Sequence, residues 1–325
     1  MAWTLAEMSK IETDVLRKSV LDTLLWESNL MQIVPWETIG TLSTGVVMIN
    51  DLPSVGFRKI NAGYAESTGT FKQKTELISL MGGYIDTDKA IARAKNTIAD
   101  ARMIQQEMML RAMAYNFNDK FINGSPVVDP EEFKGIKERI NDEVAAGNTG
   151  QYIDNAGTSG DGINLSSAER QNFLDKLDLL IHSIKGHKPD VLLMNSKCLL
   201  CVRSLLRREQ LLNNAADMFG RIIDAYQGIP MIDVGVKADQ TTEIITSTET
   251  LEAAGAAEST SIYAVKFGEG DMLWGIQEYP LEVEDKGILE ATPVYRTEID
   301  WPLGLAHVDP RSIARLYGII PDAST

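Results

Sequence analysis

The chain has 325 residues, 44% of them hydrophobic and 24% charged, a composition that is ordinary for a folded protein. This length exceeds what one hydrophobic core usually supports, so we expect at least two lobes. Acidic residues outnumber basic ones by 46 to 31, and the net charge of −15 argues against a protein that grips nucleic acid through its phosphates. Two cysteines form no disulfide framework and fit a reducing compartment.

The N-terminal sequence, MAWTLAEMSKIETD, contains acidic residues and no apolar core, so we expect no signal peptide. No apolar run approaches the roughly 20 residues of a membrane span. We therefore expect a soluble protein that is made in the cytoplasm and has no membrane partner.

The first predicted element is an amphipathic helix within residues 4–33. Thr4 and Glu7 are spaced as a capping box, apolar residues recur at helical spacing, and Pro35 ends the pattern. Two interpretations remain open. The segment is either a short helix that needs a surface to cover it, or an arm that docks on a neighbouring subunit.

A long two-stranded hairpin is predicted between Gly40 and Thr75. The runs TGVVMIND and SVGFRKIN favour β-structure, the turn-rich stretch NAGYAESTGT follows, and FKQKTELISL is again extended. A hairpin of this kind exposes both edges and buries little, so it would be marginally stable alone. We expect it to lie on another surface.

The clearest predicted helix covers residues 86–120. It is rich in Ala, Met, Arg, Lys and Gln, lacks Gly and Pro, and begins at a possible cap in Asp86–Asp88. At about 1.5 Å per residue it would be roughly 50 Å long, and Asn123 and Gly124 follow its end. One stripe is predicted to pack against the protein: Ile91, Ala94, Ile98, Ala101, Met108 and Ala112.

The second half of the chain predicts an α/β lobe and then returning strands. A Gly/Ser/Asn-rich loop over residues 145–167 precedes a helix over 168–185, a buried strand in KPDVLLMN, and a helix that carries both cysteines. Two strands around Gly228 and Pro230 come next. A polar stretch over 238–260 separates them from further strands that run from SIYAVKFG to GLAHVDPRSIARLYG.

Cys198 and Cys201 form the only CxxC pair, in the run NSKCLLCVRSLLRR. A redox pair would need an exposed thiolate at a helix N-terminus, but Leu199 and Leu200 between the cysteines are typical of a packed helix. A structural zinc would need two more ligands, and the only nearby candidates, His182 and His187, lie on another predicted segment. We therefore predict one buried helix face.

No sequence feature predicts an enzyme. With three histidines in the chain, acid–base catalysis has few starting points, and His307 follows a strand-like sequence that indicates a core or edge position. The GxSxG, Walker A, HExxH and GxGxxG motifs are absent. We predict no catalytic, cofactor-binding or metal-binding residues and no cofactor.

The order of these elements is itself informative. The stretch FRKINAGYAESTGTFKQKTELISLMGGYIDTDKAI, the exit FNDKFINGSP, the run HKPDVLLMNSKCLLCVRSLLRR and the ending VYRTEIDWPLGLAHVDPRSIARLYGI follow one another over nearly the whole chain. Together they resemble the major capsid proteins of tailed phages, which have the Hong Kong 97 type fold and are related to encapsulins.

The resemblance implies an α+β capsid fold built from an N-terminal arm, an extended β-hairpin loop, a peripheral domain with a long spine helix, and an α/β axial domain. It implies these boundaries: arm 1–40, extended loop 41–82, peripheral domain 83–140 with spine helix 86–120, axial domain 141–270, peripheral return strands 271–303, and a C-terminal axial part 304–325. The arm and the loop would lie over neighbouring subunits, which would explain why the sequence leaves both without a partner.

The implied function is that of a structural protein that self-assembles, as pentamers and hexamers, into the icosahedral head shell of a tailed double-stranded DNA phage. The implied partners are a separate scaffolding protein and a portal, and a decoration protein is left open. The shell would be assembled in the host cytoplasm, would belong to the virion, and would enclose DNA without specific binding.

Some family members join a loop lysine to an asparagine of a neighbour. Lys59, Lys72 and Lys74 are loop lysines here, but no asparagine or glutamate matches the family pattern, so we predict no covalent crosslinks. Two other functions remain as alternatives. One is an encapsulin-type nanocompartment shell, and the other is a redox or metal protein that uses Cys198 and Cys201.

Overall fold

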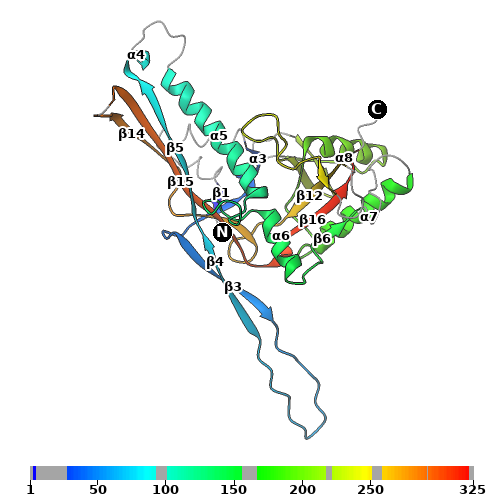
Figure 1. Cartoon of the computed structure of the whole chain (residues 1–325). Coiled ribbons are helices and arrows are strands. Elements are labelled where there is room, and N and C mark those ends of the chain that lie inside the picture. The colour runs from blue at the N-terminus through cyan, green and yellow to red at the C-terminus, as the bar shows by residue number, and fades with distance from the viewer. Residues whose placement is uncertain are drawn as a thin grey trace.

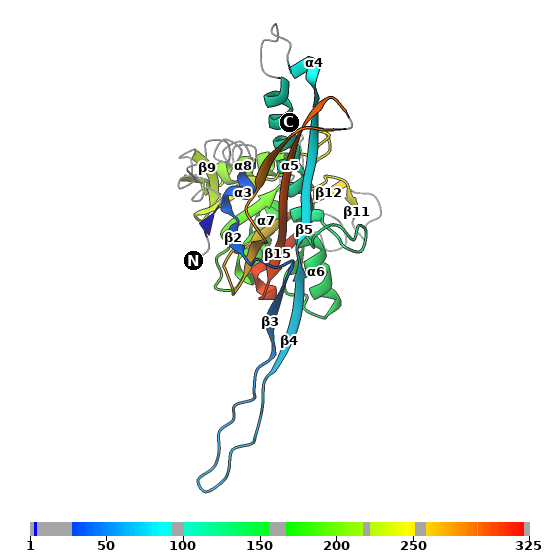
Figure 2. The ribbon, with the colours of Figure 1, turned by 90° about the vertical axis from the view of Figure 1, so that its left-hand side faces the viewer.

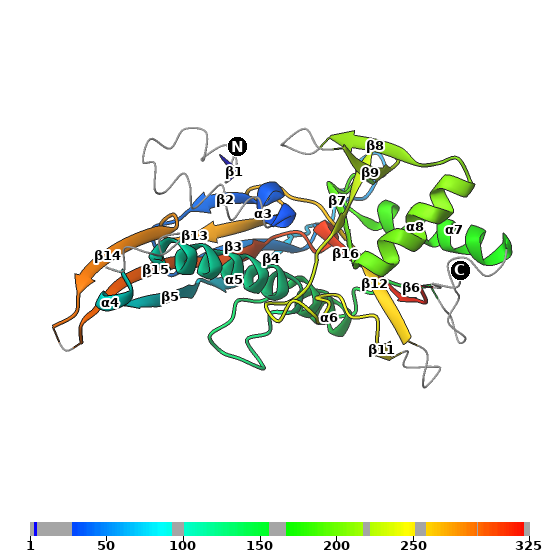
Figure 3. The same cartoon turned by 90° about the horizontal axis from the view of Figure 1, so that it is seen from above.

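The computed structural model describes residues 3–4, 28–92, 101–155, 167–216, 222–250, 258–290 and 292–321. A peripheral sheet with the long helix α5 (Ala101–Asn123) adjoins an axial lobe, and a hairpin projects away from both (Figure 1). Seen from above, the peripheral sheet and the axial helices α7 (Ser167–Ser183) and α8 (Ser196–Arg208) lie toward opposite ends of the molecule (Figure 3). None of the described helices is both long and apolar enough to cross a membrane.

The projecting hairpin consists of β3 (Ser43–Asp51) and β4 (Thr70–Leu77), which pair antiparallel from Ser43–Leu77 to Asp51–Thr70. Residues 52–69 form its tip and contain neither helix nor strand. Figure 2 shows the tip extending far beyond the rest of the described chain. The predicted two-stranded excursion with a loose tip is confirmed, but the run SVGFRKIN, expected to favour β-structure, belongs to the tip and forms no strand.

The peripheral sheet has the strand order β1-β2-β13-β15-β14, and β5 also pairs with β15. The antiparallel pairing of β5 with β15 is the longest in this sheet, and α5 lies along one face of the sheet (Figure 1). The strand bounds are β1 Trp3–Thr4, β2 Pro35–Thr38, β5 Ser79–Asp88, β13 Leu273–Gln277, β14 Glu282–Ile288 and β15 Val294–His307.

The axial lobe has a mixed sheet in the order β6-β16-β12-β7-β10-β9-β8, with β11 paired to β12. Gln227 and Gly228, both with positive φ, make the two-residue turn of its β9–β10 hairpin. The bounds of its strands and of the remaining helices are β6 Tyr152–Asp154, β7 Val191–Met194, β8 Asn213–Ala216, β9 Ile222–Tyr226, β10 Ile229–Asp233, β11 Glu249–Thr250, β12 Glu258–Val265, β16 Ile313–Ile319, α3 Asn29–Ile33, α4 Lys89–Ala92, α6 Ile136–Ala145 and η1 Pro310–Ser312.

Strand β7 explains why the run VLLM is continuously apolar. Val191 and Leu193 belong to the core shared with α5 and α6, whereas Leu192 and Met194 belong to the core under α7 and α8. A strand covered on both faces needs no polar alternation. The predicted buried strand is confirmed, although the loop expected over 145–167 contains the short edge strand β6.

Residues 28–38 form part of the body of the subunit, which differs from the arm expected over 1–40. Leu30, Met31 and Val34 are buried, and Trp36 packs against Trp301 with ring centroids 4.9 Å apart. Ser28 caps α3 by accepting a hydrogen bond from the Met31 N–H. The apolar residues of 28–38 are thus covered within the chain. Thr4 of the predicted capping box belongs to strand β1, and residues 5–27 of the predicted helix lie outside the described residues.

The long helix begins later than the sequence suggested. Residues Asp86–Asp88, interpreted as a helix cap, are the end of β5, where the Arg296 guanidinium donates to both oxygens of Asp86 at 2.7 and 2.6 Å. The stretch Ser79–Asp88 alternates inward and outward residues with period two, and pairing with β15 stabilises it as a strand. The described part of the predicted helix comprises α4, Lys89–Ala92, and α5, Ala101–Asn123, whose 23 residues are about 34 Å long, and residues 93–100 between them lie outside the described residues.

Only Met108 and Ala112 of the predicted stripe can be compared with the packing face of α5, because the burial of Ile91, Ala94, Ile98 and Ala101 lies outside what the structure describes. Met108 and Ala112 are exposed, and the buried apolar residues of the helix are Leu110, Met113, Ala114, Phe117, Phe121 and Ile122. Phe117, in the last two turns of α5, packs beside Trp36 and Trp301, and this contact helps to set which face of the helix is buried. The boundary expected at 303/304 likewise falls inside the unbroken strand β15.

Candidate assembly surfaces

The hairpin is anchored by one face only. Val46 and Met48 are buried against Trp274, Ile276 and Ala306 of the body, where Gly304 and its neighbours in β15 approach the hairpin base. The alternate residues, Val47 and Ile49, point the other way and are 58% and 66% exposed. The period of two in β3 thus separates an anchoring face from an uncovered apolar face.

The uncovered apolar surface continues to the tip. Phe71 lies opposite Ile49 in the antiparallel register and is exposed. Further exposed apolar side chains of the tip are Leu52, Val55, Phe57, Ile60 and Tyr64. So many exposed apolar side chains on one extended element indicate an interaction site, because a two-stranded hairpin is only marginally stable without further packing.

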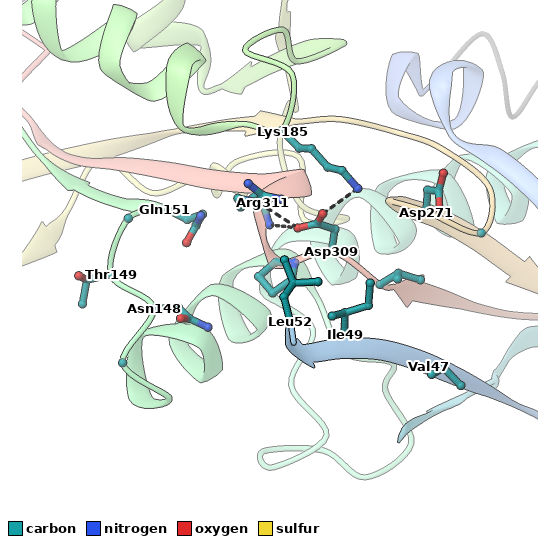
Figure 4. Close-up of a pocket in the computed structure, with 15 residues that line it drawn as sticks. Val47, Ile49, Leu52, Asn148, Thr149, Gln151, Lys185, Asp271, Asp309 and Arg311 are labelled. Carbon is teal, nitrogen blue, oxygen red and sulfur yellow. Dashed lines mark hydrogen bonds and ion pairs between the residues drawn. The ribbon is translucent and has the colours of Figure 1, made fainter. Parts of the chain in front are cut away.

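A cleft of about 800 Å³ lies where the hairpin leaves the body (Figure 4). One wall is apolar and contains Val47, Ile49 and Leu52, and the opposite wall is polar and comes from residues 147–151 and 309–311. The cleft shares Val47 and Ile49 with the exposed apolar face of β3.

Asp309 organises the polar wall of the cleft. Its carboxylate accepts from Lys185 Nζ at 2.9 Å and from the Arg311 side chain at 3.5 Å, as the dashed lines in Figure 4 show. Burial raises the pKa of Asp309, but the hydrogen bonds from Lys185 and Arg311 outweigh it and leave the pKa below its ordinary value. The carboxylate is therefore ionised, and two cations surround it. This arrangement fixes loop geometry and holds no nucleophile or general base.

The two cysteines lie where the sequence predicted. Asn195 caps α8 by accepting from the Cys198 N–H at 2.8 Å, and Cys198 and Cys201 are both buried free cysteines in the core under α7 and α8. Burial, and to a lesser extent the neighbouring Cys201 and Glu243, raises the pKa of the Cys198 thiol. A buried protonated thiol is neither a nucleophile nor a metal ligand.

The histidines do not join the cysteines. The rings of His182 and His187 stack on each other with centroids 3.7 Å apart, and His187 Nδ1 lies 2.6 Å from the His182 carbonyl oxygen. His307 is buried at the end of β15, as the sequence indicated. Among the described residues, no group of three or more His, Cys, Asp and Glu side chains is arranged to hold a metal ion.

The three loop lysines have different surroundings. Lys59 is exposed at the tip and Lys72 is exposed on β4. Lys74 is partly buried, and its Nζ lies 3.0 Å from Glu76 Oε1. Sequence reasoning missed Glu76 and its buried partner Arg139, because two charged residues 63 positions apart in ordinary polar runs give no local signal.

Comparison with known proteins agrees with this architecture. Residues 16–168 match the family model described as major capsid protein GP7. The capsid of a native GTA particle aligns with a TM-score of 0.62 at 18% identity and covers 90% of each chain. The chain has the Hong Kong 97 type capsid fold.

Other solved structures share the Hong Kong 97 type fold with this chain. A protein of Mycobacterium phage Cain aligns with a TM-score of 0.54 at 14% identity over 100% of each chain. The holo-SrpI encapsulin complex from Synechococcus elongatus PCC 7942 aligns with a TM-score of 0.62 at 15% identity, covering 91% of this chain and 89% of that one. No curated protein matches.

Proposed function

We propose that this protein is the structural major capsid protein of a tailed double-stranded DNA phage and that it has no catalytic activity. Copies of the chain assemble as pentamers and hexamers into a closed icosahedral shell in the host cytoplasm, and the shell becomes part of the virion. The observation that supports the proposal is the apolar surface of the hairpin, which the described residues leave uncovered and further copies of the chain would cover.

The proposed neighbour contact follows from this surface. The hairpin tip of one subunit lies on an adjacent copy, and the cleft beside Val47 and Ile49 is closed in the assembled shell. Burying a large apolar side chain contributes roughly 1.5–3 kcal/mol, so two or three tip residues stabilise each contact substantially. Many identical contacts of this kind would hold a closed shell together.

The proposed partners are a separate scaffolding protein and a portal, and a decoration protein stays open. The packaged DNA is enclosed without specific binding, because a chain with a net charge of −15 repels a polyanion on average. Without attraction to the inner wall, DNA would not adhere to it during packing and release.

The test replaces two tip residues by serine, Phe57→Ser with Ile60→Ser, and images the protein by negative-stain electron microscopy after expression with its scaffolding protein. Closed shells are expected from the parent chain, and folded, unassembled subunits from the tip variant. The matched control is Leu179→Ser with Leu200→Ser, two exposed apolar residues on α7 and α8, which is expected to keep forming shells. Shells from the tip variant as readily as from the control would overturn the assigned role of the hairpin.

The second candidate function is an encapsulin-type shell, which the alignment with the encapsulin from Synechococcus elongatus favours. Expression of the chain alone separates the two functions. Shells that close only with a scaffolding protein support the phage capsid, whereas small uniform shells from the chain alone support the nanocompartment. A discrete monomer or dimer under every condition contradicts both.

A further inference from the structure

A buried ion pair joins the hairpin to the body of the subunit. Arg139 of α6 donates from Nη1 to Glu76 Oε1 at 2.6 Å and from Nη2 to Glu76 Oε2 at 3.0 Å, and Glu76 belongs to β4. Arg139 is 1% exposed and Glu76 is 5% exposed. The pair is bidentate, so it fixes the relative orientation of the two groups as well as their distance.

The remaining donors of Arg139 bind the body. Its Nη2 donates to the Leu305 carbonyl oxygen of β15 at 2.8 Å, and its Nε donates to the Lys134 carbonyl oxygen at 3.1 Å. The guanidinium is thus held in place by the body before the hairpin is considered. Glu76 is the hairpin's contribution, and Lys74 adds a second cation to the same carboxylate.

The other attachments of the hairpin are less directional. The chain enters it through residues 39–42, where Gly40 has φ +60°, and leaves it through the single residue Ile78 before β5 begins. The apolar contact of Val46 and Met48 with the body favours burial but tolerates sliding and tilting, because hydrophobic contact has no direction. The ion pair is therefore the contact that selects one angle.

We infer that Glu76 and Arg139, with Lys74, form a latch that fixes the direction in which the hairpin leaves the subunit. If the hairpin swung away, Glu76 would reach water but Arg139 would stay buried with an unpaired charge, which is strongly unfavourable. Intermediate angles are therefore disfavoured, and the hairpin has one defined direction while the latch is closed. This inference concerns a single subunit and does not depend on the proposed shell function.

The test measures the hairpin angle by pulsed electron paramagnetic resonance between spin labels at Gln73→Cys on β4 and Leu179→Cys on α7. The full chain is used, either unassembled or diluted into an unlabelled excess, and the native cysteines are buried and remain unlabelled. One narrow distance distribution is expected for the parent chain. Glu76→Gln and Arg139→Met are expected to broaden it at least twofold, and the double variant to broaden it no further than either single variant, because both changes open the same latch.

The matched control is Asp142→Asn, which removes the ion pair between Lys134 and Asp142 on the exposed side of the same helix. Its distance distribution should equal that of the parent chain. If Glu76→Gln does not fold, Glu76→Asp serves instead, because a carboxylate one methylene shorter cannot reach both Arg139 nitrogens, and a shifted or broadened distance is expected. An unchanged distribution in every folded latch variant would overturn the inference, whether or not those variants still assemble.

Discussion

At the scale of single residues, His307 is the buried group whose protonation the fold opposes most clearly. Its side chain is 1% exposed, and neither ring nitrogen has a hydrogen-bonding partner in the described part of the chain. Burial and, to a lesser extent, the nearby positive charges of Arg139 and Lys74 lower the pKa of His307 to about 3. The folded protein therefore keeps this imidazole neutral.

A pH dependence of stability follows from that neutral imidazole. In the unfolded chain the histidine binds a proton below about pH 6.5, whereas in the folded chain it does so only below about pH 3. The unfolded state thus binds more protons over this interval, so the unfolding free energy should fall by about 1.4 kcal/mol for each pH unit of acidification below pH 6. Urea unfolding of subunits at pH 7, 6, 5.5 and 5 measures the slope.

The variant His307→Leu should flatten that slope, because it removes the titrating group. His182→Gln changes an exposed histidine and should leave the slope intact. The ionisation of carboxylates such as Glu76 affects the unfolding free energy only at lower pH. Burial raises the pKa of Glu76, but the hydrogen bond and charge of Arg139 bring it below its ordinary value, so its contribution is lost below about pH 4.5. Equal slopes for the parent chain and His307→Leu would contradict the assignment to His307.

At the scale of elements, the link between α5 and α6 depends on the close approach of backbones at Gly124 and Gly135. A Cβ atom at Gly124 would lie 2.4 Å from the Phe133 carbonyl oxygen and 2.5 Å from the Lys120 carbonyl oxygen, both of them backbone atoms that cannot move aside cheaply. Gly124 also accepts a hydrogen bond from the Gly135 N–H at 2.8 Å. The sequence Asn123-Gly124 predicts the end of the helix. The close approach of backbone atoms explains why a glycine is needed there.

Replacing Gly124 by alanine should therefore lower the unfolding free energy by about 1–3 kcal/mol, the usual range for overpacking. Gly56→Ala at the hairpin tip is the matched control, because a Cβ atom there meets nothing within 4 Å, and it should change stability little. Thermal or urea unfolding of both variants gives the comparison. A Gly124→Ala subunit as stable as Gly56→Ala would show that the connection relaxes freely.

The elements that the sequence predicted well are those whose pattern is local. The hairpin, the strand VLLM and the helix capped by Asn195 follow from alternation, apolar runs and capping chemistry within a few residues. The start of the long helix was missed because Asp86–Asp88 suits a helix cap as well as a strand end, and only pairing with β15 decides between them. The pair of Glu76 and Arg139 was missed for the same reason, since its partners meet only after folding.

At the scale of the whole molecule, an incomplete subunit explains several features together. The apolar hairpin tip, the cleft at its base and the exposed Met103, Ile104 and Met108 of α5 are uncovered within one described chain. A protein that functioned alone would leave such surface at risk of aggregation. A shell covers it with further copies, and a latch at the hairpin base would direct the tip to the same place on every neighbour.

The contacts between copies are expected to be non-covalent. Forming an amide between a lysine and an asparagine requires a deprotonated amine beside a general base. Lys59 and Lys72 are exposed to water, and the amine of Lys74 is bound by Glu76 inside the latch.

Mature shells boiled in SDS should therefore release a single band at 35.8 kDa, the mass of the chain. A ladder of higher bands would contradict this. Burial lowers the pKa of Lys74, so Lys74→Arg would then be the first variant to test, and a ladder that disappeared in it would identify the crosslinking amine.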